Sequence, residues 1–245
     1  MDTDEALLKK RFRELAERAE SRGVTLCSDF LNLYEQSVLA AAVPRGVSTD
    51  GGFDGAERRV AVFAPDGAPA GEPPLAVVRI SPLNRKFADD LAHRDFLGAL
   101  LATGVKRETL GDILVTDDGA FVLCLARVRD FLCENLTAVK HTAVRCEVLP
   151  TLPDTAQKPP ENRRVNVASQ RLDALIAAVW HLPRGKSAAL CAGEKVFVNS
   201  RLTVSGAASL DDGDIVSVRG TGRFRLNGIA GESKKGRLFA DVDIW

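Results

Sequence analysis

Basic side chains stand at two predicted helix starts in the last third of the chain, where they could bind phosphate groups. Arg171 precedes one apolar helical stretch, and Arg184 and Lys186 open the next one. A guanidinium can pair two phosphate oxygens at once, and a helix N-terminus favours an anion through its dipole. This pattern indicates a surface that binds a phosphate backbone. For Arg171 the alternative is a salt bridge with Asp173 or Asp214.

Catalytic chemistry is a competing use of the polar residues. His93-Arg94-Asp95 looks like the start of a kinase catalytic loop, but Leu100 stands where that loop needs asparagine. Gly185-Lys186-Ser187 looks like the end of a Walker loop, but Trp180 stands where its first glycine is required. The five cysteines are scattered and form no C-x-x-C pair. We therefore predict no enzyme activity, no cofactor and no metal site.

The stretch from Arg171 to Arg219 predicts two short helices followed by strands. Ser169 is the expected cap of the first helix. The apolar residues of that helix have the spacing of one buried face: Leu172, Leu175, Ile176 and Val179. A hairpin with a turn at Asn199-Ser200 follows, and an Asp-rich turn leads into a strand from Ile215 to Arg219.

This stretch resembles the S-four RNA-binding domain, the module named after ribosomal small-subunit protein four. The matching residues come in the family's order: Arg171-Leu172-Asp173, Arg184, Lys186, Lys195 to Asn199, and Gly213-Asp214 leading into Ile215 to Val218. Ser200 departs from the family pattern, in which Asn-Gly is common at the hairpin turn. The resemblance implies a small α+β RNA-binding module in residues 163–245.

The rest of the chain mixes helical and strand patterns, which indicates an α+β fold. The predicted helices are residues 4–21, 30–42, 87–102 and 128–136, with Ser28 or Asp29 capping the second. The predicted strands are residues 60–64, 75–80, 112–115, 120–126, 141–149, 163–168 and 238–244. A strand around Phe224 and Leu226 should show Arg223 and Arg225 on its open face and end in a turn at Asn227-Gly228.

Proline-rich residues 151–162 predict a linker between two regions of opposite charge. From Arg163 onward there are 13 Lys and Arg against 8 Asp and Glu, although the whole chain is balanced at 33 of each. We expect N-terminal helices with a two-strand subdomain in residues 1–80 and a second α+β subdomain, RNA-binding in character, in residues 81–150. A basic module on an acidic body suits nucleic-acid binding.

Blocks along nearly the whole chain are similar to the YlmH family. They are FDGAERRVAVF at 53–63, PLNRKFADDLAHRDFLGALLATGVKRETLGDILV at 82–115, VKHTAVRCEVL at 139–149 and VRGTGRFRLNGIAGESKKGRL at 218–238. The resemblance implies an RNA-binding middle domain, a C-terminal S-four domain and association with the large ribosomal subunit. It also implies a role in quality control, in the rescue of stalled large subunits that carry peptidyl-tRNA.

We expect RNA as the partner, ribosomal RNA first and tRNA as a further candidate. The predicted RNA contacts of the C-terminal module are Arg171, Arg184, Lys186, Lys195, Arg201, Arg219, Arg223, Arg225, Lys234, Lys235 and Arg237. A second candidate surface in the preceding region comprises Arg58, Arg59, Arg85, Lys86, His93, Arg94, Lys106, Arg107, Lys140 and His141. For Lys195 a purely structural role fits the pattern equally well.

Two other functions fit the same residues. An S-four domain also occurs on RNA-modifying enzymes such as pseudouridine synthases, so a modifying enzyme or its accessory subunit is one alternative. A protein–protein adaptor is the other. No apolar run approaches the length of about 20 residues that a membrane span needs. We therefore expect a cytoplasmic protein that has no membrane partner and acts as a monomer.

Overall fold

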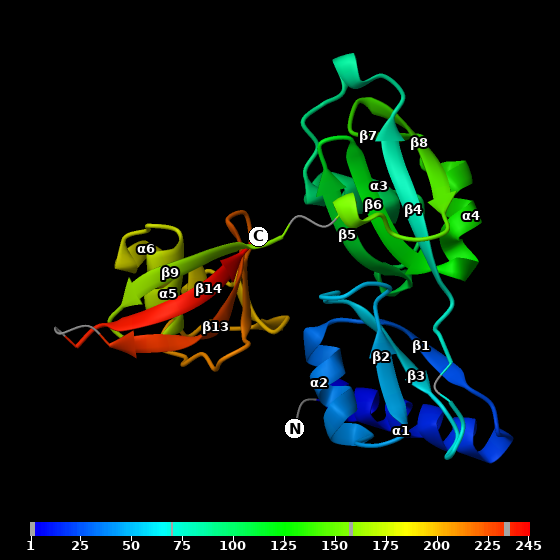
Figure 1. The fold of residues 1–245 in the computed structure, drawn as a ribbon, viewed down its shortest axis with the longest axis horizontal. Helices are drawn as coiled ribbons and strands as arrows, with labels where there is room; N and C mark the ends of the chain where they lie inside the picture. The colour runs from blue at the N-terminus through cyan, green and yellow to red at the C-terminus, as the bar shows by residue number, and fades with distance from the viewer. Residues whose placement is uncertain (1–2, 70, 157–158, 233–235) are drawn as a thin grey trace. The chain divides into compact units, whose positions relative to one another are not determined.

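The N-terminal part of the chain forms a three-stranded antiparallel sheet with two helices packed on it (Figure 1). The computed structural model describes residues 3–69, 71–156, 159–232 and 236–245. The chain divides into two units, residues 1–158 and 159–245. The elements of this first layer are α1 (Thr3–Arg22), β1 (Leu26–Leu31), α2 (Leu33–Ala42), β2 (Val47–Asp50) and β3 (Arg59–Phe63), and the strand order is β1-β3-β2. Phe12 of α1 and Leu39 of α2 share one core with Ala61 and Phe63 of β3.

The predicted helix over residues 30–42 is wrong at its N-terminal end. Phe30 belongs to β1, which pairs with β3, and α2 begins only at Leu33. Asn32 caps α2: its side chain accepts a hydrogen bond from the N–H of Glu35 at 3.0 Å, and the Glu35 carboxylate accepts one from the N–H of Asn32 at 2.7 Å. Ser28, one of the predicted caps, instead accepts from the N–H of Ala61 across the sheet at 2.9 Å.

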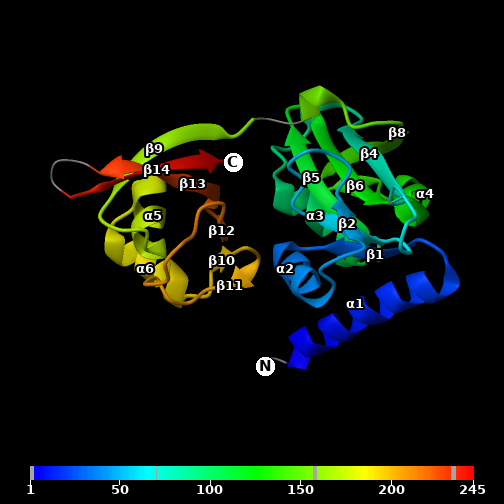
Figure 2. The same cartoon turned by 60° about the horizontal axis from the view of Figure 1, so that its bottom comes forward.

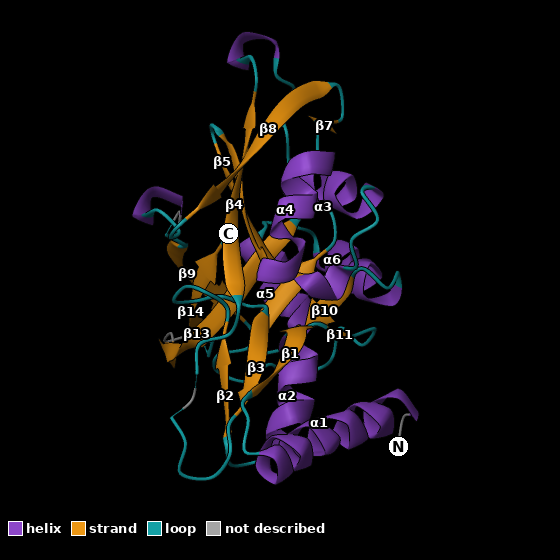
Figure 3. Ribbon diagram, turned by 90° about the vertical axis from the view of Figure 1, so that its right-hand side faces the viewer, coloured by secondary structure: helices purple, strands orange, loops and turns teal. Residues whose placement is uncertain are grey.

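A five-stranded antiparallel sheet with two helices on one face follows (Figures 1 and 3). Its elements are β4 (Leu75–Pro82), α3 (His93–Ala102), β5 (Leu110–Thr116), β6 (Gly119–Leu125), α4 (Ala126–Asn135), β7 (Ala138–Val139) and β8 (Thr142–Leu149), in strand order β5-β6-β4-β8-β7. Short 3-10 turns occupy Arg85–Phe87, Arg107–Thr109 and Asp154–Ala156. Alternate strand residues such as Val78 and Val122 pack under Phe96 of α3 and Leu132 of α4.

The two sheets of the first unit meet in a shared apolar core. Val77 and Phe121 on the other face of the five-stranded sheet pack with Phe30 and Val60 of the three-stranded sheet. The strand over residues 75–80, which the sequence analysis grouped with the N-terminal subdomain, is the central strand of the five-stranded sheet, because β4 pairs with both β6 and β8. Residues 1–158 therefore form one unit built from two sheets.

The helix predicted over residues 87–102 is shorter than expected. It begins at His93, because the Asp95 carboxylate accepts a hydrogen bond from the N–H of Ala92 at 2.8 Å and so caps the first turn. Asp89 lies before the helix and accepts hydrogen bonds from the N–H of His141 and the hydroxyl of Thr142. The segment that was predicted as the first helical turns therefore connects the helix to the β7–β8 turn.

The second unit is a six-stranded antiparallel sheet with two helices on one face (Figure 2). Its elements are β9 (Glu161–Val167), α5 (Leu172–Val179), α6 (Arg184–Ala192), β10 (Val196–Val198), β11 (Arg201–Leu202), β12 (Ile215–Val218), β13 (Gly222–Glu232) and β14 (Leu238–Ile244), in strand order β11-β10-β12-β13-β14-β9. Both units combine helices with antiparallel sheets, which confirms the predicted α+β class.

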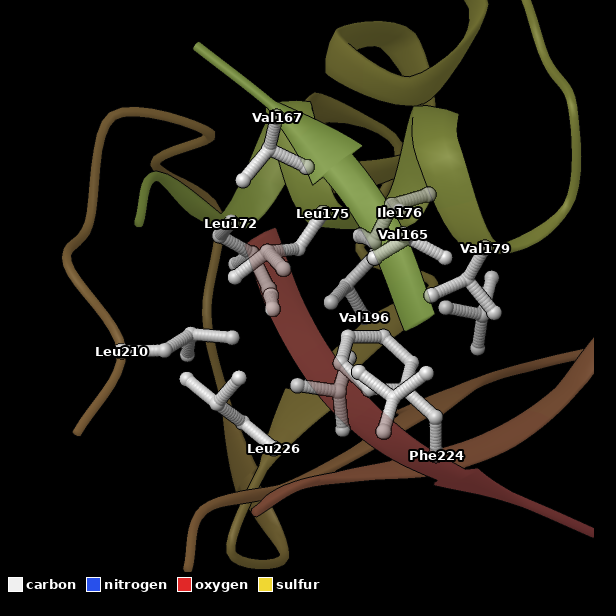
Figure 4. Packing of buried hydrophobic residues seen from close by; sticks show 14 of the residues in the cluster. Val165, Val167, Leu172, Leu175, Ile176, Val179, Val196, Leu210, Phe224 and Leu226 are labelled. Atoms are coloured by element: carbon white, nitrogen blue, oxygen red, sulfur yellow. The ribbon is translucent and has the colours of Figure 1, made fainter. Parts of the chain in front are cut away.

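The core of this unit lies between the helices and one face of the sheet (Figure 4). The predicted helical face is confirmed, because Leu172, Leu175, Ile176 and Val179 are all buried. They meet alternate residues of the strands: Val165, Val167, Val196, Val216, Val218, Phe224, Leu226, Ala240 and Val242. The residues between these on each strand consequently face away from the core.

Two turns of this unit test the sequence predictions directly. Asn199 and Ser200 have φ values of +48° and +65° and form the predicted hairpin turn, with the two positive φ angles of a type I′ turn. The predicted turn at Asn227-Gly228 is wrong, because β13 continues through it and only the pairing register with β14 shifts there. Such a bulge keeps the strand paired while bending it.

Candidate nucleic-acid interface

The starts of α5 and α6 lie against each other in the second unit. The Ser187 hydroxyl is fully buried and donates a hydrogen bond to the carbonyl of Asp173 at 2.8 Å. This bond joins the first turn of α6 to the first turn of α5. The basic residues at the two helix starts are therefore brought into one region of the surface, as the sequence analysis expected.

Arg171 is engaged within the protein. Its Nε and Nη2 atoms donate to the two carboxylate oxygens of Asp173 at 3.1 and 2.9 Å. The hydrogen bonds from Arg171 hold the pKa of Asp173 below its usual range. The salt bridge that the sequence analysis kept as an alternative for Arg171 is therefore present. No side-chain cap precedes α5, and Ser169 does not serve as one.

The N-terminus of α5 is closed by a neighbouring loop. The N–H groups of Leu172 and Asp173 donate to the carbonyls of Ala208 and Gly206 at 2.8 and 2.9 Å. These are the groups through which a helix start usually binds an anion. Because the 206–208 loop accepts these hydrogen bonds, the two N–H groups are not available to bind a phosphate at the start of α5, as the sequence analysis predicted they would be.

Arg184 and Lys186 are the exposed cations of this region. Both side chains lie on the first turn of α6 and face solvent. No ion pair holds either of them within the described ranges of the chain. Arg184 lies close enough to Asp173 to help lower its pKa, although the hydrogen bond from Arg171 has the larger effect. These two side chains can exchange solvent for phosphate oxygens without breaking an internal bond.

The basic residues of the strands lie on the opposite face of the unit. Arg219 stacks over Phe197, with its guanidinium carbon 4.6 Å from the ring centroid. Arg223 and Arg225 stack over Trp245 at 5.1 and 5.5 Å. The sequence analysis predicted that Arg223 and Arg225 would be exposed on the open face of the strand. Both are only half-exposed, because each packs against Trp245.

The remaining predicted contacts of this unit differ in their surroundings. Lys195 is exposed just before β10, and its carbonyl accepts from the N–H of Arg219 at 2.9 Å. Arg201 is exposed on the hairpin, and Arg237 donates to the carbonyl of Asn166 at 2.9 Å. Lys234 and Lys235 lie outside the residues that the structure describes.

Two basic residues predicted for the second surface, Arg58 and Arg107, are turned inward. Arg58 donates to the carbonyls of Leu110 and Phe30 at 2.9 and 3.0 Å, and Arg107 donates to the carbonyl of Leu110 at 2.7 Å. Burial and the nearby Arg58 lower the pKa of Arg107 to about 10. Their donors satisfy backbone carbonyls where the two sheets meet, so we assign both residues a structural role.

Other members of that surface gather near the start of α3. The Lys140 ammonium pairs with Asp95 at 2.8 Å, which places the β7–β8 turn beside the helix start. The hydrogen bond from Lys140 is the main cause of the lowered pKa of Asp95. His141 lies 3.8 Å from the Asp89 carboxylate and is 94% exposed, and Arg94 is 83% exposed. His93 is exposed on the same first turn of α3.

The last four predicted residues of this surface belong neither to α3 nor to the β7–β8 turn. Arg85 pairs with Asp118, and Arg59 donates to the carbonyl of Ala56 at 2.9 Å. Lys86 and Lys106 are exposed. The structure therefore brings together only part of the second predicted surface, at the α3 start and the β7–β8 turn.

The kinase-like triplet at residues 93–95 has a structural explanation. Asp95 caps α3 and pairs with Lys140, which leaves its carboxylate 9% exposed and engaged on both sides. Among the described residues no group of His, Cys, Asp or Glu side chains is arranged to hold a metal ion. No helix in the described part of the chain is long and apolar enough to cross a membrane.

Comparison with known proteins supplies the family. Residues 75–152, which span β4 to β8, match the family described as "Putative RNA-binding domain in YlmH". The chain is 32% identical over 216 residues to the "Ribosome-associated protein quality control protein P2" of Bacillus subtilis (strain 168), covering 85% of this chain and 82% of that protein. The chain belongs to the YlmH family. The resemblance of the sequence to the YlmH family is thereby confirmed.

The fold of this YlmH-family chain also matches a solved structure. The "Cell division protein ylmH from Streptococcus pneumoniae" aligns with a TM-score of 0.50 at 18% identity, covering 61% of this chain and 93% of that one. At this identity the match supports the fold. The sequence analysis missed one feature of the YlmH-family chain, the stacking of arginines on Phe197 and Trp245, because each ring lies 20 to 22 residues from the arginines that stack on it.

Proposed function

We propose that this chain is a ribosome-associated RNA-binding protein that acts without catalysis in the quality control of stalled translation. The relative from Bacillus subtilis is named as a ribosome-associated quality control protein, and the family matched by residues 75–152 is described as RNA-binding. We propose further that it docks on the large ribosomal subunit. There it contacts structured ribosomal RNA and the tRNA that carries the stalled peptide.

The exposed pair Arg184 and Lys186 is the observation that carries this proposal. Both lie on the first turn of α6, free of internal ion pairs among the described residues. A cation that is already paired must give up its partner to bind phosphate, whereas these two give up only water. We propose that residues 163–245 are an S-four-type domain and that this turn is its primary RNA contact.

Structured RNA is the partner that suits this surface. The deep major groove of an A-form helix hides the base edges, so proteins read such RNA through phosphates, 2′-hydroxyls and shape. A short helix that presents one arginine and one lysine supplies charge for phosphates but no aromatic surface for bases. Arg171 adds little to this charge, because its guanidinium is paired with the Asp173 carboxylate.

A second contact at the α3 start extends the proposal to the first unit. Arg94, His93 and His141 are exposed there, around the Lys140–Asp95 ion pair. This group lies within the region that matches the RNA-binding family description. We propose it as an auxiliary RNA surface, and we leave out Arg58 and Arg107 because their guanidinium groups donate to backbone carbonyls within the first unit.

Sedimentation of the full chain in a bacterial lysate tests the proposal. The tagged protein should co-migrate with large subunits at low salt and move to the top of the sucrose gradient when the salt is raised, since phosphate contacts release counterions. Pull-down after nuclease treatment should lose the association. Migration at the top of the gradient at every salt concentration would refute the ribosomal role, and survival of the association after nuclease would assign it to protein contacts.

A further inference from the structure

The outer edge of β8 in the five-stranded sheet is open over the second half of the strand. β7 pairs only with the start of β8, at Thr142 and Ala143. The N–H of Val144 then donates to the carbonyl of Thr137 at 2.9 Å. Beyond Val144 no strand among the described residues pairs with this edge, whereas β4 pairs with the other edge as far as Leu149.

Two residues of β8 direct their backbone groups to this open edge. The N–H of Leu83 donates to the carbonyl of Ala143 at 2.9 Å, so these two residues form a hydrogen-bonded pair between β4 and β8. Such pairs alternate along an antiparallel ladder, so every second residue from Ala143 to Leu149 bonds to β4. Cys146 and Val148 lie between those residues and therefore point their N–H and C=O groups outward. In the part of the chain that the structure describes, these four groups have no hydrogen-bond partner.

The side chains along this edge differ between its two faces. Cys146 packs against the core under α3 and α4, and Val148, two residues on, lies on the same face and is 38% exposed. Glu147 points to the other face and is exposed. It lies opposite Arg79 in the β4–β8 pairing, but no ion pair joins these two side chains. A strand added to this edge would therefore meet apolar side chains on one face and a carboxylate on the other.

The open edge ends at a groove within the first unit. The groove has a volume of about 680 Å³, and its apolar wall includes Phe53, Leu75, Val148, Leu149 and Leu152. Ligand sites in proteins commonly have volumes of this order. Because Val148 belongs both to the open edge and to the groove, a peptide that follows the edge reaches the groove with its next side chains.

A second copy of this chain does not suit the edge. Antiparallel pairing of two β8 edges through Cys146 and Val148 places two Glu147 side chains opposite each other, and like charges in that position are destabilising. Pairing centred on Val148 instead places Cys146 opposite Pro150, which has no N–H to donate. The edge therefore favours a strand of a different sequence.

We propose that the open edge of β8 binds an extended segment of another protein as an added antiparallel strand. The chemistry of that segment follows from the edge: apolar side chains opposite Cys146 and Val148, a basic side chain opposite Glu147, and a further apolar side chain for the groove. Peptides add to exposed sheet edges in this way, with backbone hydrogen bonds supplying affinity and side-chain contacts supplying specificity. The inference goes beyond the proposed function and does not depend on it.

A synthetic peptide of this pattern tests the inference with the full chain. The probe is acetyl-Leu-Thr-Val-Lys-Val-Thr-Leu-amide, and its binding should shift the NMR signals of the Cys146 and Val148 amides. N-methylation of both valines removes the two donors that face β8 and should weaken binding at least about fivefold, since two hydrogen bonds are lost. N-methylation of the lysine, whose N–H faces away from β8, is the matched control and should leave the affinity unchanged. Equal binding of the valine-methylated probe, or unshifted Cys146 and Val148 signals, would overturn the inference.

An exchange of charges provides an independent test. Glu147→Lys should weaken binding of the probe about two- to tenfold, because like charges then lie opposite each other. A probe with glutamate in place of lysine should recover this affinity with the variant, and failure to recover it would overturn the assigned register. Glu17→Lys makes the same charge change at an exposed position of α1 and should have no effect on the probe. Arg184→Ala with Lys186→Ala should also bind the probe normally, which separates this edge from the RNA surface of the proposed function.

Discussion

Replacing both Arg184 and Lys186 with alanine should flatten the salt dependence of binding to large ribosomal subunits. The two side chains are exposed on one helical turn, and no internal ion pair within the described residues competes for them. Each phosphate contact lowers the slope of log affinity against log salt by about 0.7 to 0.9, because bound counterions are released. The loss of two such contacts removes about 1.4 to 1.8 from the slope.

That change in slope is large enough to measure over a modest range of salt. Between about 50 and 200 mM salt, the unchanged chain should lose roughly tenfold more affinity than the double variant. Pelleting of the full chain with purified large subunits across this range supplies both slopes. The expected result is a weaker but less salt-sensitive association.

A matched control separates local contacts from bulk charge. Lys10→Ala with Arg127→Ala removes the same two charges, but Lys10 lies 3.8 Å from Glu14 and Arg127 lies 2.7 Å from Asp29 in the first unit. This control should keep the original slope. Equal flattening in the control would show that only net charge matters, and an unchanged slope in the double variant would remove α6 from the RNA surface.

Three further predictions concern the second unit. Leu175→Ala should destabilise it by about 2 to 5 kcal/mol, because Leu175 is fully buried in the core; a loss below about 1 kcal/mol in urea unfolding would contradict this packing. Ser200→Gly should stabilise it by about 0.5 kcal/mol, since serine is strained at a φ of +65° and glycine is not; an equal or lower midpoint in the same unfolding experiment would argue against the turn. Asp173→Asn should lower the melting temperature most at neutral pH. The bond from Arg171 lowers the pKa of Asp173 in the folded state, so its stabilisation is present above the unfolded value near 4 and is lost as the pH falls through the lower folded pKa. A melting difference that is constant from neutral to acidic pH would contradict this pairing.

The helical faces of the second unit could be predicted from sequence because they depend on local spacing. Leu172, Leu175, Ile176 and Val179 recur at one helical period, and the structure buries all four. The hairpin turn at Asn199 and Ser200 was predictable for the same reason, since the conformational preferences of the few residues in a turn determine where it forms.

The errors arose where distant contacts decide the local structure. Phe30 and Leu31 pair with β3, about thirty residues later in the chain, and this pairing makes a strand of the two residues that local pattern assigns to a helix. At Asn227-Gly228 the chain stays paired with β14, so the expected turn becomes a bulge within a continuous strand.

The role of individual cations was the least predictable feature of the candidate site. Arg58 donates to carbonyls that lie 28 and 52 residues away in the sequence, so its neighbours in sequence do not reveal its partners. The partner of Arg171 lies only two positions along, so that alternative could be foreseen. Sequence therefore identifies which residues are basic, and the fold decides which of them are free.

The pairing of β9 with β14 has a consequence for how the second unit is made. Glu161 lies opposite Ile244, so β9 cannot complete its pairing until β14 is present. Val165 and Val167 of β9 complete the core, so this sheet closes only after the β14 segment has emerged from the ribosome that synthesises it. Contacts so distant in sequence slow folding. The α5–α6 pair is local and can form first, whereas the sheet that joins β9 to β14 forms only after the β14 segment has been synthesised.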